Sequence, residues 1–245
     1  MKKMESSGRF LSRKLADAGS AIYRKLIFPF VKAGIERRCD SIIGKGAYLY
    51  KGTRLEGRDY IGDGTQLCNV RVGYSSYIGP GSIVSNTKIG RYTCIAGVET
   101  AIGRHPVKGE CVSVHPAFYS SAAHYGYTYV KDTTYEEALY TDKENGYNIT
   151  IGNDVWIGRD VMITDGVTIG DGAVIGARSL VKSNVAPYAI YAGTPAIRIG
   201  FRFDEETIEK LLKIRWWDRD EKWIAANAGK FINPGEFVKE FGTDR

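Results

Sequence analysis

An aliphatic residue recurs every six positions in the second half of the chain, and this repeat restricts the fold more than any other feature. The series consists of Ile151, Ile157, Ile163, Ile169, Ile175 and Val181. Most of these residues are followed by glycine, and a second series of aliphatic or small residues begins at Val155 with the same period. A similar array, with skips in register, runs from Ile43 to about Ile102. The period matches neither the 3.6 residues of a helical turn nor the alternation of two in a simple strand.

A repeat of this kind is typical of a chain that coils through short strands. One aliphatic side chain per strand would point inward, and the glycine would occupy the tight corner. Successive coils would stack at roughly 4.8 Å, the usual spacing between strands, so that backbone groups pair from coil to coil. The sequence therefore predicts an all-β solenoid over residues 42–200.

Two segments flank the repeats and a third interrupts them. Residues 1–41 form a predicted helical arm and residues 201–245 a predicted helical tail, in which Asp204 is expected to cap a helix. Residues 104–148 lack the repeat and are predicted to leave the solenoid as a long loop. They hold all three histidines and seven of the sixteen tyrosines. A long loop on a rigid scaffold is where we expect the functional residues.

Positive charge is concentrated at the N-terminus. Residues 1–38 contain ten Lys and Arg against three acidic residues, a net +7, so the other residues contribute −1 to the total of +6. Apolar residues from Phe10 to Phe30 recur near helical spacing among these cations. Such a helix could cap the open end of the solenoid, which we favour, or lie on an anionic membrane surface. The neutral body carries no nucleic-acid recognition motif, so no nucleic-acid partner is expected.

Cysteine usage and the lack of a signal sequence predict a cytoplasmic protein, peripheral to the inner membrane face if the arm binds lipid. The four cysteines (Cys39, Cys68, Cys94, Cys111) show neither a CxxC pair nor metal spacing and fit reduced core residues. The three histidines lie ten and nine residues apart, which does not favour a metal site. We expect no bound metal.

The stretch IGNDVWIGRDVMITDGVTIGDGAVIGARSLVKSNVAPYAIYAGTPA, residues 151–196, is similar to the hexapeptide-repeat acyltransferases. The tail FDEETIEKLLKIRWWD, residues 203–218, resembles the branch that contains chloramphenicol and streptogramin acetyltransferases. The resemblance covers about residues 42–215. It implies a left-handed parallel β-helix, a homotrimer with active sites between subunits, and acetyl-CoA as the acyl donor.

His105, in IGRHPVKG, lies where the first array ends, and in the family a histidine at this place is the general base. Acetyl transfer from a thioester to a hydroxyl requires removal of one proton, and neutral imidazole accepts protons near neutral pH. The resemblance thus makes His105 the catalytic residue, with His115, in SVHPAFYS, as the alternative. An acid should orient the other ring nitrogen, and Glu99 and Glu110 are the candidates.

The tyrosine-rich loop indicates a saccharide acceptor, because aromatic faces stack on sugar C–H groups and carboxylates accept hydrogen bonds from hydroxyls. We expect His115, Tyr119, His124 and Tyr125 to bind it. The pattern GRHP…SVHPAFYS resembles capsule and O-antigen O-acetyltransferases. The predicted activity is therefore acetyl-CoA-dependent O-acetylation of a saccharide hydroxyl. The alternatives are an antibiotic-inactivating acetyltransferase of the chloramphenicol or streptogramin type and a non-enzymatic β-helix scaffold.

The resemblance also indicates which positions would contact acetyl-CoA. Small residues let the pantetheine arm approach the backbone, and cations suit its phosphates. The candidates are Trp156, Gly158, Arg159, Ala177, Lys182, Arg198 and Arg202.

Overall fold

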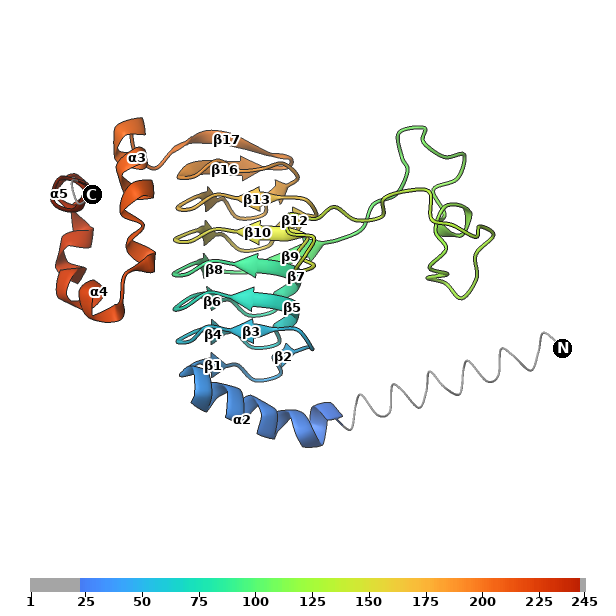
Figure 1. The fold of residues 1–245 in the computed structure, drawn as a ribbon, viewed down its shortest axis with the longest axis horizontal. Coiled ribbons are helices and arrows are strands. Elements are labelled where there is room, and N and C mark those ends of the chain that lie inside the picture. Colours follow the sequence, from blue (N-terminus) through green and yellow to red (C-terminus); the bar gives the residue numbers. More distant parts are fainter. Residues whose placement is uncertain (1–22, 243–245) are drawn as a thin grey trace.

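The computed structural model describes residues 23–242, whose short strands wind into a solenoid with helices at both ends (Figure 1). All pairings between coils are parallel, and among the described strands only β16 and β17 pair antiparallel. The strands lie on three faces, here called faces 1, 2 and 3 in the order in which each coil visits them. The predicted fold class, a left-handed parallel β-helix with a loop excursion and terminal helices, is confirmed.

Face 1 is a sheet of eight strands in the order β1-β4-β6-β8-β11-β14-β16-β17. Its strands are β1 (Ile42–Ile43), β4 (Tyr60–Ile61), β6 (Tyr77–Ile78), β8 (Cys94–Ile95), β11 (Trp156–Ile157), β14 (Val174–Ile175), β16 (Ala189–Gly193) and β17 (Ala196–Phe201).

Faces 2 and 3 are connected because two longer strands, β5 (Gln66–Val72) and β7 (Ile83–Ile89), bend from one face to the other. The start of β5 pairs with β2 and its end with β3, and β7 pairs in the same way with β9 and β10. The remaining strands of face 2 are β2 (Tyr48–Leu49), β9 (Val98–Ala101), β12 (Val161–Thr164) and β15 (Leu180–Val181). Those of face 3 are β3 (Arg54–Leu55), β10 (Ile149–Ile151) and β13 (Thr168–Ile169).

The six-residue series fills the interior of the solenoid, as predicted. Each of its six members, from Ile151 to Val181, is at most 1% exposed. The series that begins at Val155 is buried as well, and both series join one continuous core with the first array. The six-residue aliphatic period thus identifies the side chain of each strand that points inward.

The repeat glycines have a different role from the one predicted. Gly73 and Gly158, which follow inward aliphatic residues, do not have a positive φ. They are required because the next coil is close: a Cβ on Gly73 would lie 2.4 Å from the backbone of Gly90. Other residues adopt the left-handed corner conformation, among them Asn69 (φ 53°) and Asn86 (φ 45°). The expectation that the repeat glycine takes the tight corner is therefore wrong for these positions.

Coil length explains the skips in the first array. Tyr60 pairs with Tyr77 and Tyr77 with Cys94, a step of 17 residues each time. Trp156 pairs with Val174, a step of 18 residues, which is three full repeats. The long excursion does not disturb this stacking, because Cys94 pairs directly with Trp156 across it. The chain leaves the solenoid after β9 and returns at β10, and Figure 1 shows the excursion projecting away from the coils.

The N-terminal helix lies against the first coil. A π-helical turn, η1 (Tyr23–Ile27), leads into α2 (Phe28–Cys39). The ring centroid of Phe28 is 4.4 Å from that of Tyr48, and Ile35 packs against the main core. The predicted arm also includes residues 1–22, which lie outside the described residues.

The C-terminal helices lie beside the coils rather than across their end (Figure 1). They are α3 (Glu205–Ile214), η3 (Trp216–Asp218), α4 (Glu221–Asn227), η4 (Ala228–Ile232) and α5 (Pro234–Phe241). Asp204 caps α3 as predicted, accepting a hydrogen bond of 2.8 Å from the Thr207 amide. These helices share a second core that includes Leu211 and Phe237. No helix between residues 23 and 242 combines the length and apolar character needed to cross a bilayer.

Candidate active site

His105 lies exposed on the excursion with one ring nitrogen already bonded. Its Nδ1 is 2.8 Å from the carbonyl oxygen of Val114 and 2.9 Å from the hydroxyl of Tyr119. A carbonyl oxygen can only accept, so the hydrogen bond to Val114 places a proton on Nδ1. In the neutral ring Nε2 then carries the lone pair. This arrangement can remove a proton from a hydroxyl group placed at Nε2.

Neither Glu99 nor Glu110, the predicted orienting acids, is among the hydrogen-bond partners of the His105 ring in the described residues. Within residues 23–242, the hydrogen-bond partners of the His105 ring are the Val114 carbonyl and the Tyr119 hydroxyl. Glu110 instead accepts a hydrogen bond of 2.7 Å from the Lys108 amide. A backbone carbonyl fixes the tautomer of an imidazole as a carboxylate would, so the geometry needs no acid.

Two tyrosines hold the segment that carries His105. Tyr119 is completely buried, and burial raises the pKa of its phenol, which keeps the hydroxyl protonated. Tyr135, which the sequence analysis did not single out, donates a hydrogen bond of 3.0 Å to the carbonyl oxygen of His105. Its ring centroid lies 5.4 Å from that of Tyr119. Both residues therefore restrict the position of the imidazole.

His115 has a structural contact of its own. Its Nδ1 accepts a hydrogen bond of 3.2 Å from the Ala117 amide and caps the short helix η2 (Pro116–Phe118). Because Nδ1 accepts, the neutral ring carries its proton on Nε2 and lacks a free lone pair. Rings surround it at centroid distances of 6.3, 5.7 and 6.0 Å, from Phe118, Tyr125 and Tyr127. These rings and Tyr129 form an exposed aromatic cluster on the excursion.

His124 pairs with an acid that the sequence analysis did not assign. Its Nε2 lies 3.1 Å from Oε1 of Glu137, whose Oε2 accepts a hydrogen bond of 2.6 Å from Ser120. The Glu137 carbonyl also accepts from the Arg104 amide at 2.7 Å. Glu137 thus connects His124 to Arg104, the residue that precedes His105 in the chain. No spacing pattern marks it, because the contact depends on how the excursion folds.

Four of the acetyl-CoA candidates meet at the corner between faces 1 and 2. Trp156 is 45% exposed on β11, and Gly158 and Arg159 follow it at the corner. A Cβ on Gly158 would lie 2.6 Å from the Ala177 amide nitrogen, so the two coils are in direct contact there. The Arg159 side chain is exposed, 3.8 Å from Asp160. An exposed ring, closely stacked backbone and an exposed cation suit a ligand with an extended amide arm and phosphates.

The other candidates are distributed more widely. Lys182 follows β15 at the far end of face 2, and Arg198 lies on β17, 4.9 Å above the ring of Phe201. Arg202 is at a different corner, between faces 3 and 1, where its Nη1 donates to the Asp154 carboxylate at 3.0 Å and to the Gly172 carbonyl at 2.8 Å. Burial, opposed by Arg202, raises the pKa of Asp154. The guanidinium group of Arg202 is therefore already hydrogen-bonded within this corner.

One chain does not bring His105 and the acetyl-CoA candidates to the same corner. The segment with His105 departs between faces 2 and 3, whereas Trp156, Gly158 and Ala177 lie between faces 1 and 2. In the described part of the chain, no group of three or more His, Cys, Asp and Glu side chains is placed to hold a metal ion.

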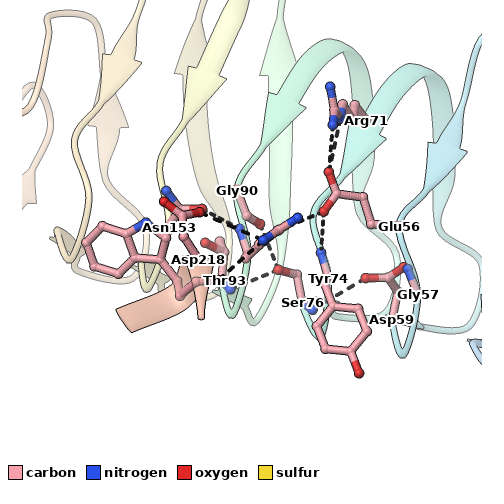
Figure 2. A network of polar contacts seen from close by, with 12 residues as sticks. Glu56, Gly57, Asp59, Arg71, Tyr74, Ser76, Gly90, Thr93, Asn153 and Asp218 are labelled. Atoms are coloured by element: carbon pink, nitrogen blue, oxygen red, sulfur yellow. Dashed lines mark hydrogen bonds and ion pairs between the residues drawn. The ribbon is translucent and has the colours of Figure 1, made fainter. Parts of the chain in front are cut away.

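A polar network at the corner between faces 3 and 1 was not anticipated from the sequence. Figure 2 shows Glu56 between Arg71 and the backbone of Tyr74. Glu56 also accepts from Arg91 at 3.0 Å, and Arg91 lies 3.8 Å from Asp218 of the C-terminal tail. Although burial acts against it, hydrogen bonds from Arg71 and Arg91 lower the pKa of Glu56. This ionised group joins the first coils to the tail.

Comparison with known proteins places the repeat in a family. Residues 148–183 match the family described as bacterial transferase hexapeptide (six repeats). A chloramphenicol acetyltransferase of Klebsiella aerogenes is 45% identical over 101 residues, 41% of this chain and 48% of that protein. A probable macrolide acetyltransferase of Lysinibacillus sphaericus is 59% identical over 68 residues, 28% of this chain and 38% of that protein. The matched region thus spans less than half of either curated relative.

A similar solved structure is a hexapeptide-repeat acetyltransferase of Vibrio cholerae O1 biovar eltor, in complex with acetyl-CoA. It has 19% identity and a TM-score of 0.44, over 78% of this chain and 87% of that chain. The repeat, the coils and the family match define a hexapeptide-repeat β-helix protein. Within that class, residues 148–183 are similar to bacterial hexapeptide transferases, and the curated relatives that match this chain are acetyltransferases.

Proposed function

We propose that the protein is an acetyl-CoA-dependent O-acetyltransferase that acts on a saccharide hydroxyl, with His105 as the general base. The observation that carries the proposal is the hydrogen bond from Nδ1 of His105 to the Val114 carbonyl, which leaves Nε2 as the proton acceptor. This imidazole lies on an exposed loop, in a chain whose repeats match the bacterial transferase hexapeptide family and whose curated relatives are acetyltransferases.

In the proposed reaction, acetyl-CoA supplies an activated acetyl group and the acceptor hydroxyl supplies the nucleophile. Nε2 of His105 removes the hydroxyl proton as the new ester bond forms, and the proton then passes to the departing thiolate. Tyr119 and Tyr135 keep the imidazole in position, so Tyr119 is assigned to positioning rather than to acceptor contact. Holding the two reactants together removes the need for an acyl-enzyme.

The corner with Trp156, Gly158, Arg159 and Ala177 is the proposed binding site for acetyl-CoA. Lys182 and Arg198 are proposed phosphate contacts, because both side chains are exposed cations. Arg202 is left out of this set because its guanidinium is bonded to Asp154 and Gly172. The exposed rings of Tyr125, Tyr127 and Tyr129, together with His115 and His124, are the proposed acceptor surface.

The functional unit is proposed to be a homotrimer with sites between subunits. The outward positions of face 1 form an apolar row in coil-to-coil register, and its most exposed members are Ile42, Tyr60, Tyr77 and Trp156. An apolar row of this length is typical of a surface that is covered in the assembled protein. A neighbouring subunit would also supply the corner that His105 lacks in its own chain.

We propose that the N-terminal arm caps the solenoid, with contact to an anionic membrane surface at the cytoplasmic face as the alternative. Capping is supported by α2, which lies against the first coil. Membrane contact is supported by the exposed side chains of Leu26 and Phe30, which accompany the basic residues Arg37 and Arg38.

Acetylation of an antibiotic is the second candidate. It is supported by the curated relatives, which are named chloramphenicol and macrolide acetyltransferases and match the region around the repeats. The saccharide is favoured because four exposed aromatic rings gather on the excursion, where they offer stacking faces for sugar C–H groups.

The decisive test measures thiol release from acetyl-CoA with a panel of saccharide and antibiotic acceptors. For His105→Ala we expect a loss of about 10²–10⁴-fold in acceptor-dependent release, the usual effect of removing a general base. Binding of acetyl-CoA to this variant, followed by calorimetry, should remain unchanged. Release that survives the substitution would overturn the role of His105. Wild-type protein that neither binds acetyl-CoA nor releases thiol would favour the scaffold.

A further inference from the structure

Three basic side chains stack on the outer surface of face 3. In register along the solenoid, Arg54 pairs with Arg71 and Arg71 pairs with Lys88. All three side chains are exposed. Neighbouring parallel strands are separated by roughly 4.8 Å, so the cations repeat along the solenoid axis at about the length of one sugar residue. We call these three residues the basic ladder.

The basic ladder lines a groove that the excursion closes on one side. The groove has a volume of about 340 Å³, and its walls include Glu56, Asp142 and Tyr147 besides the ladder itself. Asp142 and Tyr147 pair as a small hairpin at the base of the excursion. The hairpin is attached to the coils by a hydrogen bond of 3.3 Å from Asn69 to the Gly146 carbonyl.

The charges in the groove are only partly compensated. Arg71 donates to Glu56 at 2.8 Å, and Glu56 is shared with Arg91. Hydrogen bonds from Asn145 lower the pKa of Asp142, and the nearby charge of Lys88 contributes a smaller part. Lys88 and Asp142 do not form an ion pair. The Arg54 side chain has no hydrogen bond or ion pair with any residue between 23 and 242. An exposed guanidinium fork without a partner is suited to a carboxylate.

We propose that this groove binds a carboxylate-bearing polysaccharide along the solenoid axis. The basic ladder would meet acidic groups on successive sugars, while Asp142 and Tyr147 provide an acceptor and a ring face for hydroxyl and C–H groups. This mixture fits an acidic glycan, because the cations meet its carboxylates while Asp142 and Tyr147 offer partners to its hydroxyl and C–H groups.

The inference rests on the proposed function, because it assigns the acceptor of that reaction to acidic polysaccharides. The groove ends at the excursion, and the same excursion carries His105. A polymer held in the groove is therefore anchored beside the loop that presents the proposed base. Extended acceptors gain binding contacts here that a single sugar does not have.

The test is direct binding of two polymers of similar length, polygalacturonate and uncharged dextran, to the full chain by calorimetry at low salt. Wild type should bind polygalacturonate and not dextran. In Arg54→Glu/Lys88→Glu, affinity should fall by about ten-fold or more, because two charge-assisted contacts become repulsive. The matched control is Lys45→Glu/Lys222→Glu, which makes the same charge change at exposed sites outside the groove.

Four outcomes would overturn the inference. These are failure of wild type to bind polygalacturonate, equal binding by the groove variant, equal weakening in the control, and equally tight binding of a single-stranded oligonucleotide. The measurement needs no acetyl-CoA, and His105 is unchanged in both variants. Wild type that releases thiol to small acceptors but does not bind polygalacturonate would therefore reject the groove alone. Wild type that binds polygalacturonate but releases no thiol would reject the proposed reaction alone.

Discussion

Asp59 is a buried carboxyl group that forms no ion pair with any residue between 23 and 242. It lies at the corner between faces 3 and 1, 1% exposed, and accepts hydrogen bonds from the Gly57 amide at 3.0 Å and the Ser76 amide at 3.4 Å (Figure 2). Burial raises its pKa to about 7, and the backbone hydrogen bonds only partly oppose this. The residue therefore changes ionisation near neutral pH for a reason unrelated to catalysis.

We expect this carboxyl to make the protein less stable as the pH rises. An unfolded Asp ionises near pH 4, whereas Asp59 in the folded state holds its proton up to about pH 7. Between these values the folded state binds more protons, so the free energy of unfolding falls with pH, by at most about 4 kcal/mol in total. Urea unfolding of Asp59→Asn at pH 5 and pH 8, at one protein concentration, should show a smaller difference than wild type.

Asp132→Asn, which removes an exposed carboxyl on the excursion, is the control and should retain the wild-type difference. An unchanged difference in Asp59→Asn would contradict the assignment to Asp59.

The coil is the element on which the whole solenoid depends, and its stacking is limited by space at the repeat glycines. Gly73, Gly90 and Gly158 each face the backbone of the next coil at a distance that leaves no room for a methyl group. The sequence pattern located these glycines correctly, but it did not show why they are needed. The reason is a contact between residues one coil apart, which composition and period do not report.

Gly73→Ala should therefore destabilise the protein. Its Cβ would meet the Gly90 backbone at 2.4 Å, and the forced shift should cost about 1–3 kcal/mol, as overpacked substitutions do. The thermal unfolding midpoint measures the effect. Gly34→Ala, at a helical position in α2 with open space around it, should leave the midpoint unchanged or raise it. A stable Gly73→Ala variant would show that adjacent coils can separate locally.

At the scale of the whole molecule, the fold could be predicted from the repeats. The candidate site could be predicted only in part, because it lies on the excursion, which has no repeat. Ile151 and its successors report the inward side of every strand, so the solenoid follows from a single period. His105 could be named as the candidate base because the repeat stops beside it. Its partner, the Val114 carbonyl, and the pairing of His124 with Glu137 come from the folding of a segment without any repeat. No periodic signal encodes such contacts.

The apolar row of face 1 leads to a prediction about assembly. Tyr77→Lys places a charge in the middle of this row and should convert the proposed trimer largely to monomers. Sedimentation velocity measures the change, and thiol release should fall with it because the proposed site lies between subunits. Thr168→Lys, on the outer surface of face 3, should remain trimeric. A trimeric Tyr77→Lys variant would locate the subunit contact on another surface.

The pairing of Cys94 with Trp156 has a consequence for how such a protein can diversify. The coils before and after the excursion stack on each other as though the intervening residues were missing. The segment between Ala101 and Ile149 can therefore be lengthened, shortened or exchanged without altering any strand pairing of the scaffold. Because the proposed base and the proposed aromatic acceptor surface lie on this insert, the scaffold can keep its architecture while the residues offered to an acceptor change.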